Sequence, residues 1–371
     1  MPVTSVMGVV TVRFITPLLI DGANKYSVDS AGLTGKALRG SWRFWFRAVI
    51  GGMYKEIRSE ELLFLESRIF GSADTKDSKG NKIGAKFRMI IDKENEIPDD
   101  SIKLGFNKPC RNCKGKGCYQ CNFKGKSNNP ATSQGYLENS SYRIQIIPRS
   151  TMSEMEVKVL FSIIWVWGNL GAVGKRERRG FGSPVICSNS KRNPFLFRLN
   201  EKTIELPLKE TFEDTWKIEE HLRKGLNLMW NVCSLWVEEN SFVHNEKLSA
   251  SICGANNPVN SPFFLLRSCG QIFIGNAGFI DRNDAIAKFH GDSECNGLGW
   301  AKGTHRMASP VLIRFHKINT ENIEKLVPAV SWCQQKKVER QDTNGCALSY
   351  LKNMQINGES IFVYNLNGGT L

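Results

Sequence analysis

The 371-residue sequence lacks the features of a membrane or secreted protein. No apolar run approaches the roughly 20 residues that a membrane-spanning helix needs. The first residues also lack the basic segment, apolar core and small-residue cleavage site of a signal peptide. We therefore expect a cytoplasmic protein. In a reducing compartment, its 11 cysteines are expected to be metal ligands where they cluster and small buried residues where they are scattered.

Acidic residues are scarce in the first half of the chain, and histidine is absent from its first 220 residues. Residues 1–200 contain 32 Lys and Arg against 17 Asp and Glu, whereas residues 201–371 contain 18 against 19. This excess of positive charge favours nucleic acid as the partner of the first half. The histidines form no metal-ligand spacing, and all five lie in the neutral half: His221, His244, His290, His305 and His316.

The apolar periodicity of residues 1–200 predicts the order β-α-β-β-α-β. Strands are expected at Val9–Ile15, Lys86–Ile91, Tyr142–Ile147 and Phe181–Cys187, and helices at Gly35–Ile50 and from Ser153. Ser153 and Glu156 have the spacing of a capping box. This order is that of a ferredoxin-like, RRM-like domain. The gap before the third strand is too long for a plain loop, so an insertion is predicted at about 92–141.

Residues 201–371 are predicted to form a second α+β domain, and a second ferredoxin-like fold is the hypothesis for it. Thr215–Glu238 has the pattern of a long helix. The shorter elements expected are strands at 271–279 and 310–316, a helix near 347–354 and a strand at 360–364. Residues 200–211 are predicted to link the two domains.

Two Cys-x-x-Cys pairs separated by four residues lie inside the predicted insertion. Each pair can form a chelating turn, and four thiolates suit tetrahedral zinc. Gly115 and Gly117 permit the sharp turn between the pairs. An iron–sulfur cluster or two separate redox pairs are the alternatives. The sequence predicts a structural zinc knuckle with the ligands Cys110, Cys113, Cys118 and Cys121.

Glycines and cations alternate between the second predicted helix and the fourth predicted strand. Glycines expose backbone amides and permit close approach, and the cations attract phosphates. The segment is neither a phosphate-binding P-loop nor a dinucleotide fingerprint. A solvated basic turn is the alternative. The residues predicted here to bind a nucleic-acid phosphate backbone are Gly174, Lys175, Arg176, Arg178, Arg179, Gly180 and Gly182.

Three arginines of the first predicted helix, Arg39, Arg43 and Arg47, are spaced four residues apart and so share one face. No acidic residue is interleaved with them, so they repel one another unless an anion lies nearby. That anion is a bound anionic partner in one interpretation and a carboxylate from elsewhere in the fold in the other. We predict that the three arginines bind a nucleic acid.

Several of these segments occur in an order that resembles a known family. They are Phe14–Leu18 with Gly22, Leu38–Arg47, Glu66–Ser72, Arg178–Ser183 and, later, Arg306–Pro310. The series resembles the RAMP superfamily of CRISPR proteins. Within that superfamily it is most similar to the first RAMP subunit of type III-B (Cmr) effector complexes.

The resemblance implies two ferredoxin-like domains and membership of a multi-subunit ribonucleoprotein. It further implies a non-catalytic antiviral subunit that holds the 3′ region of the crRNA or the guide–target RNA duplex, with crRNA, target RNA and other protein subunits as partners. The family's glycine-rich loop corresponds to residues 174–183 and its first-helix arginines to Arg39, Arg43 and Arg47, so the resemblance implies that these residues bind RNA. The alternative is a RAMP-type endoribonuclease that processes crRNA precursors, which needs a positioned His or a Lys–Tyr set.

Overall fold

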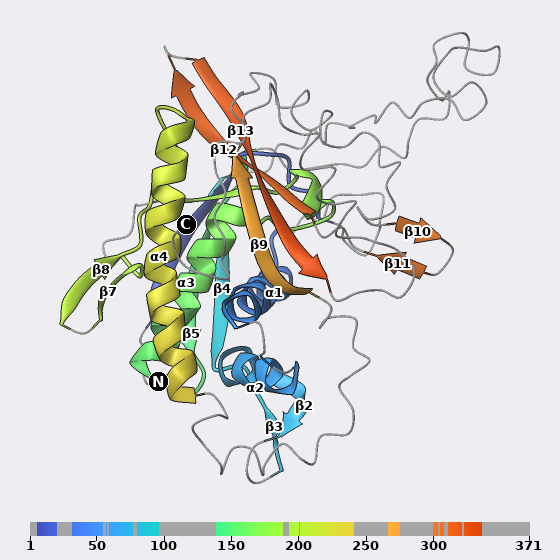
Figure 1. The fold of residues 1–371 in the computed structure, drawn as a ribbon, viewed down its shortest axis with the longest axis vertical. Helices are drawn as coiled ribbons and strands as arrows, with labels where there is room; N and C mark the ends of the chain where they lie inside the picture. Colours follow the sequence, from blue (N-terminus) through green and yellow to red (C-terminus); the bar gives the residue numbers. More distant parts are fainter. Residues whose placement is uncertain are drawn as a thin grey trace.

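The computed structural model describes residues 6–20, 32–54, 57, 59–76, 80–95, 139–187, 193–199, 201–240, 266–274, 300–302, 305–307, 311–320 and 323–335. These residues form an α+β fold (Figure 1). The predicted cysteine knuckle and the elements predicted at 347–354 and 360–364 lie outside the described residues. In the described part, no helix is both long and apolar enough to cross a membrane.

A four-stranded antiparallel sheet carries the first half of the chain. Its strands are β1 (Gly8–Phe14), β4 (Phe87–Lys93), β5 (Ser141–Pro148) and β6 (Pro184–Cys187), paired in the order β4-β5-β1-β6. Helix α1 (Gly35–Met53) lies between β1 and β4 in the chain, and α3 (Glu154–Leu170) connects β5 to β6. Because β5 lies between β1 and β4 and β1 lies between β5 and β6, two split βαβ units interlock. The connectivity predicted for the first half is therefore confirmed.

Alternation along β1 explains why the helices cover one face of this sheet. Val10, Val12 and Phe14 are buried, while the residues between them are partly exposed. The buried side chains join Trp42 of α1 and Trp167 of α3, whose rings lie 6.0 Å apart, in one apolar cluster. The predicted capping box begins α3. The Glu156 amide donates to Ser153 Oγ at 3.1 Å, and the Ser153 amide donates to Glu156 Oε2 at 3.0 Å.

Tertiary packing moves several predicted boundaries. Helix α1 continues through Gly51 and Gly52, where the sequence predicted its end, because both glycines are buried in the core. Residues 200–211 are not a linker. A hairpin of β7 (Leu196–Leu199) and β8 (Lys202–Glu205) occupies part of them, and Leu206 is completely buried.

Three further elements of the first half were not predicted. Helix α2 (Ser59–Phe70) packs on α1, and the short strands β2 (Ser72–Lys76) and β3 (Lys82–Ile83) form a hairpin after it.

The second half packs directly on the first. Helix α4 (Thr215–Asn240) confirms the predicted long helix and lies along α3, where Gly225 leaves room for the Trp165 ring (Figure 1). Phe46 of α1 and Trp236 of α4 stand edge to face with ring centroids 5.9 Å apart. A single cluster of buried apolar side chains thus spans both halves. The domain boundary at residue 200 stays a prediction.

A three-stranded antiparallel sheet follows α4. Its strands are β9 (Leu266–Ile274), β12 (Val311–Thr320) and β13 (Ile323–Gln335), in the order β12-β13-β9. The strands β10 (Trp300–Lys302) and β11 (His305–Met307) form a separate hairpin. Strand β9 lies against α1, and β12 lies against the segment that connects α3 to β6. A second ferredoxin-like fold stays a prediction.

Candidate nucleic-acid interface

The Gly–Arg loop, residues 171–183, connects the end of α3 to β6 and is held by backbone hydrogen bonds from two sides. The amides of Lys175 and Gly182 donate to the carbonyls of Leu19 and Pro17, which follow β1, at 2.8 and 2.9 Å. On the other side, the Gly180 amide donates to the Ile313 carbonyl of β12 at 3.0 Å. The loop is therefore a fixed part of the fold and not a freely moving turn.

The glycines give this loop its shape. Gly180 and Gly182 have positive φ angles of 84° and 62°, a region that side-chain-bearing residues rarely adopt. A Cβ at Gly180 would lie 2.4 Å from the Phe315 ring, and one at Gly182 would lie 2.0 Å from the Val173 carbonyl oxygen. Both positions face protein, so internal packing explains why they are glycine. The contact of these glycines with RNA stays a prediction.

The predicted cations of the loop lie at and just beneath the surface. Lys175 is exposed, and Arg176, Arg178 and Arg179 are half-buried around a 3₁₀ turn at Glu177–Arg179. The Arg178 guanidinium lies 5.0 Å from the centre of the Phe44 ring on α1, which fixes its direction. Burial lowers the pKa of Arg176 from its usual value.

The acidic residue of the loop behaves differently from a surface carboxylate. Burial raises the pKa of Glu177 to about 7, and the nearby Arg178 acts in the opposite direction. Glu177 is therefore partly protonated near neutral pH. Its protonation increases the net positive charge of the Gly–Arg loop.

Two of the three arginines on α1 are bound by a carboxylate of the protein itself. Glu66 of α2 is completely buried; its Oε1 lies 2.5 Å from the Arg43 guanidinium, and its Oε2 lies 3.2 Å from Arg47 Nη1. Burial lowers the pKa of Arg47, and Glu66 opposes this. For Arg43 and Arg47 the structure therefore contains the carboxylate partner that was the alternative to a bound anion. Glu66 is the first residue of the Glu66–Ser72 segment.

Arg39 has other surroundings. Its guanidinium lies 5.9 Å from the centre of the Phe87 ring, and its Nε is buried without a hydrogen-bond partner. Burial, followed by the positive charges of Arg149 and Arg43, lowers the pKa of Arg39. Arg149, an exposed residue just after β5, thus adds a cation that the sequence did not indicate.

Strand β12 contributes a residue that the sequence reasoning did not select. Arg314 is 1% exposed and bonds to backbone on both sides of the Gly–Arg loop. A single charged residue within the apolar run Val311–Phe315 was the available signal, because a buried arginine requires partners.

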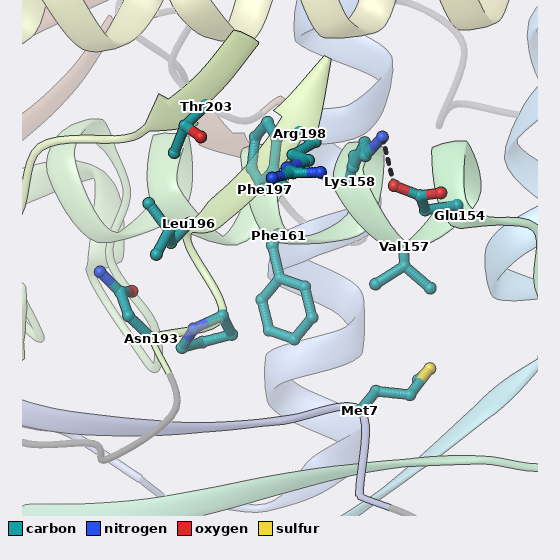
Figure 2. Close-up of a pocket in the computed structure, with 11 residues that line it drawn as sticks. Met7, Glu154, Val157, Lys158, Phe161, Asn193, Leu196, Phe197, Arg198 and Thr203 are labelled. Carbon is teal, nitrogen blue, oxygen red and sulfur yellow. Dashed lines mark ion pairs between the residues drawn. The ribbon is translucent and has the colours of Figure 1, made fainter. Parts of the chain in front are cut away.

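A cavity of about 510 Å³ lies at the end of α3 that is opposite to the Gly–Arg loop, between the start of that helix and the β7–β8 hairpin. Figure 2 shows Val157, Phe161 and Phe197 in its wall, together with the ion pair of Lys158 and Glu154. Helix α3 has 17 residues, so about 25 Å of helix separates the two ends. None of the predicted RNA-binding residues lines this cavity.

Within the part of the chain that the structure describes, no three His, Cys, Asp or Glu side chains converge on a point that would hold a metal ion. The four cysteines predicted to bind zinc lie outside that part.

Comparisons with known proteins place these features in a family. The model of the RAMP superfamily matches residues 11–185. Over 181 residues the chain is 28% identical to the CRISPR system Cmr subunit Cmr1-2 of Pyrococcus furiosus, with 46% of this chain and 89% of that protein covered. The crystal structure of Cmr1 from Pyrococcus furiosus in its apo form aligns at a TM-score of 0.47 and 15% identity, over 98% of this chain and 99% of that one.

A chain in the cryo-EM structure of the type III-B Cmr-beta bound to cognate target RNA aligns at a TM-score of 0.47 and 10% identity, over 92% of this chain and 98% of that one. The family match extends from β1 into β6 and includes the α1 arginines, Glu66 and the whole Gly–Arg loop. On this match and the curated relative, residues 11–185 of the chain belong to the RAMP superfamily and are distantly related to Cmr1.

Proposed function

We propose that this protein is a non-catalytic RNA-binding subunit of a type III-B CRISPR effector complex. In that role it contacts the 3′ region of the crRNA or the guide–target RNA duplex and serves antiviral defence. The curated relative is named as a Cmr subunit, which supports this class of assembly. The partners proposed are crRNA, target RNA and other protein subunits.

The observation that carries the proposal is the Gly–Arg loop. Four cations occur within the five residues Lys175–Arg179, on a backbone that is hydrogen-bonded to the segment after β1 and to β12. A loop that is fixed before binding loses less conformational entropy on binding. Cations of this kind bind phosphates irrespective of the base sequence, as recognition of an RNA duplex by its shape requires.

The arginines of α1 differ in what they offer RNA. Arg43 and Arg47 already neutralise Glu66, and they hold α2 on α1. Arg39 is surrounded by like charge from Arg149 and Arg43, which an RNA phosphate would relieve. We therefore assign RNA contact first to the loop cations, then to Arg39, and in a smaller measure to Arg43 and Arg47.

The endoribonuclease alternative gains no support from the histidines whose side chains the structure describes. His221 and His316 are buried. Burial and the nearby Arg314 lower the pKa of His221 to about 3 and that of His316 well below its usual range. Neither is a protonated acid near neutral pH, as general acid–base cleavage would require.

Replacement of Arg176, Arg178 and Arg179 by Ala tests the proposal. We expect weaker binding of an RNA duplex. We also expect the slope of the logarithm of the binding constant against the logarithm of the salt concentration to be smaller in magnitude by up to about 2 to 3, because each phosphate contact contributes about 0.7 to 0.9. The control variant replaces Lys202, Lys217 and Lys224, three exposed lysines outside the loop, and removes the same charge. Equal effects of the two variants, or none from the loop variant, would refute the proposal.

We also propose that Cys110, Cys113, Cys118 and Cys121 hold one structural zinc ion. Their spacing and the basic residues around them favour zinc-bound thiolates. Elemental analysis of the purified protein is expected to give about one zinc per chain. Zinc is expected to be lost when Cys110 and Cys118 are both changed to Ser. Visible absorption typical of iron–sulfur clusters would contradict this proposal.

A further inference from the structure

Arg314 of β12 is a buried cation with an unusual set of partners. Its Nη1 donates hydrogen bonds to the carbonyls of Gly168 and Asn169 at 2.9 and 2.5 Å, and its Nη2 donates to the Pro184 carbonyl at 2.6 Å. Gly168 and Asn169 belong to the last turn of α3, and Pro184 begins β6. One guanidinium therefore joins the two stems of the Gly–Arg loop.

The stem on α3 needs such a cation. The last carbonyls of a helix have no partner within the helix and carry partial negative charge. The last turn of α3 contains no basic residue of its own. Arg314 supplies the missing donor and charge from a strand 144 residues further along the chain than Leu170. Burial lowers the pKa of Arg314 to about 9, so the guanidinium remains charged near neutral pH.

The residues on either side of Arg314 hold the loop as well. The Ile313 carbonyl accepts the Gly180 amide, and the Phe315 amide donates to Ser183 Oγ at 3.2 Å. Ser183 Oγ in turn donates to the Gly180 carbonyl at 3.2 Å. Three consecutive residues of β12, Ile313–Phe315, thus fix both stems of the Gly–Arg loop and its C-terminal part around Gly180 and Ser183.

We propose that Arg314 is a positioning residue for RNA binding, which acts by fixing both stems of the Gly–Arg loop. This inference rests on the proposed function, because the position of the loop matters only if the loop binds RNA. Arg314 is 1% exposed, so it does not itself contact the RNA. The second half of the chain thereby controls the RNA affinity of cations that belong to the first half.

The first test is Arg314→Lys, which keeps the charge but loses the fork that reaches both stems. We expect RNA-duplex affinity to fall by about 2- to 30-fold, the range for residues that influence a site without touching its ligand. Hydrogen exchange is expected to accelerate in residues 171–183 while β1 and β5 stay protected. Unchanged exchange in the loop, or a uniform rise throughout the protein, would overturn the proposal.

The second test places Arg314→Lys in the background of the triple-alanine loop variant. If Arg314 acts through the loop cations, its substitution has no further effect there. An equal loss of affinity in both backgrounds would overturn the positioning role alone. Full RNA affinity in the triple-alanine variant would overturn the proposed function together with this inference.

Two further variants separate positioning from general destabilisation. Ser183→Ala removes the acceptor of the Phe315 amide and is the milder test if Arg314→Lys fails to fold. Leu226→Ala opens a cavity in the buried face of α4 and serves as the control. At equal loss of thermal stability, we expect Ser183→Ala to weaken RNA binding more than Leu226→Ala. The reverse order would overturn the proposal.

Discussion

Substitution of Glu66 by Gln removes the negative charge that pairs with two arginines of α1, Arg43 and Arg47. Glu66 is 0% exposed, and Arg47, the more buried of its two partners, is 11% exposed. In the variant, Arg43 and Arg47 repel each other without a counterion. The amide also turns a donor toward one of them. The substitution is therefore expected to destabilise the fold much more than loss of one exposed ion pair does.

The magnitude follows from the burial of the partners. Removal of one member of a buried ion pair costs about 3–5 kcal/mol, because the remaining charge stays uncompensated. Arg43 is 33% exposed and recovers part of its hydration, so we expect a loss of about 3 kcal/mol in the free energy of unfolding. At about 2.1 cal/mol/K per residue, unfolding of 371 residues has an entropy of about 0.8 kcal/mol/K, so this loss lowers the melting temperature by roughly 4 °C.

Calorimetry of the 371-residue protein measures this effect, with Glu154→Gln as the matched control. Glu154 pairs with Lys158 at the start of α3, but its side chain is 76% exposed, so we expect its loss to lower the melting temperature much less than loss of Glu66 does. A Glu66→Gln shift no larger than the Glu154→Gln shift would refute the reasoning. Glu66 would then not be the structural counterion of Arg43 and Arg47.

The remaining predictions concern pH and two glycines. The pKa of His221 is lowered to about 3 by burial, so the unfolded state binds the proton more readily. Stability is therefore expected to fall by up to about 1.4 kcal/mol per pH unit as the pH drops below about 6.5. Urea unfolding at pH 7 and pH 5 should show a smaller difference for His221→Gln than for the unchanged protein. Gly225→Ala is expected to destabilise by about 1–3 kcal/mol, because a Cβ there would lie 2.0 Å from the Trp165 ring. Gly40→Ala has open space and is expected to stabilise α1 by up to about 1 kcal/mol in the same denaturation assay.

Local sequence patterns predicted most of the helices and strands in the first half of the fold. Alternation predicted β1 and β5, helical spacing predicted α1 and α3, and the capping box at Ser153 located the start of α3. Helix α2 was missed because the continuous apolar run Leu62–Leu65 shows neither period clearly. Strand β13 was missed because Pro328 interrupts its pattern, and proline is rare within sheets.

The residues of the candidate site likewise include some that the sequence predicted and some that only the tertiary structure reveals. The cations of the Gly–Arg loop are contiguous in sequence, so composition alone revealed them. The pairing of Glu66 with Arg43 and Arg47 depends on how α2 packs on α1, which no local pattern specifies. The bonds of Arg314 to the loop stems join residues 130 or more positions apart. Contacts of this kind are determined by tertiary packing, and the sequence offered only an arginine in an apolar run.

Crosslinking within an assembled guide complex tests the central claim most directly. A photoreactive uridine is placed in the 3′ region of the guide RNA in one sample and at its 5′ end in another, and the crosslinked peptides are mapped by mass spectrometry. The account predicts that the 3′ probe labels the peptide containing residues 171–183, and that the triple-alanine loop variant loses this label. Labelling of that peptide by the 5′ probe alone, or none with either probe, would contradict the claim that the Gly–Arg loop holds the 3′ part of the guide or its duplex.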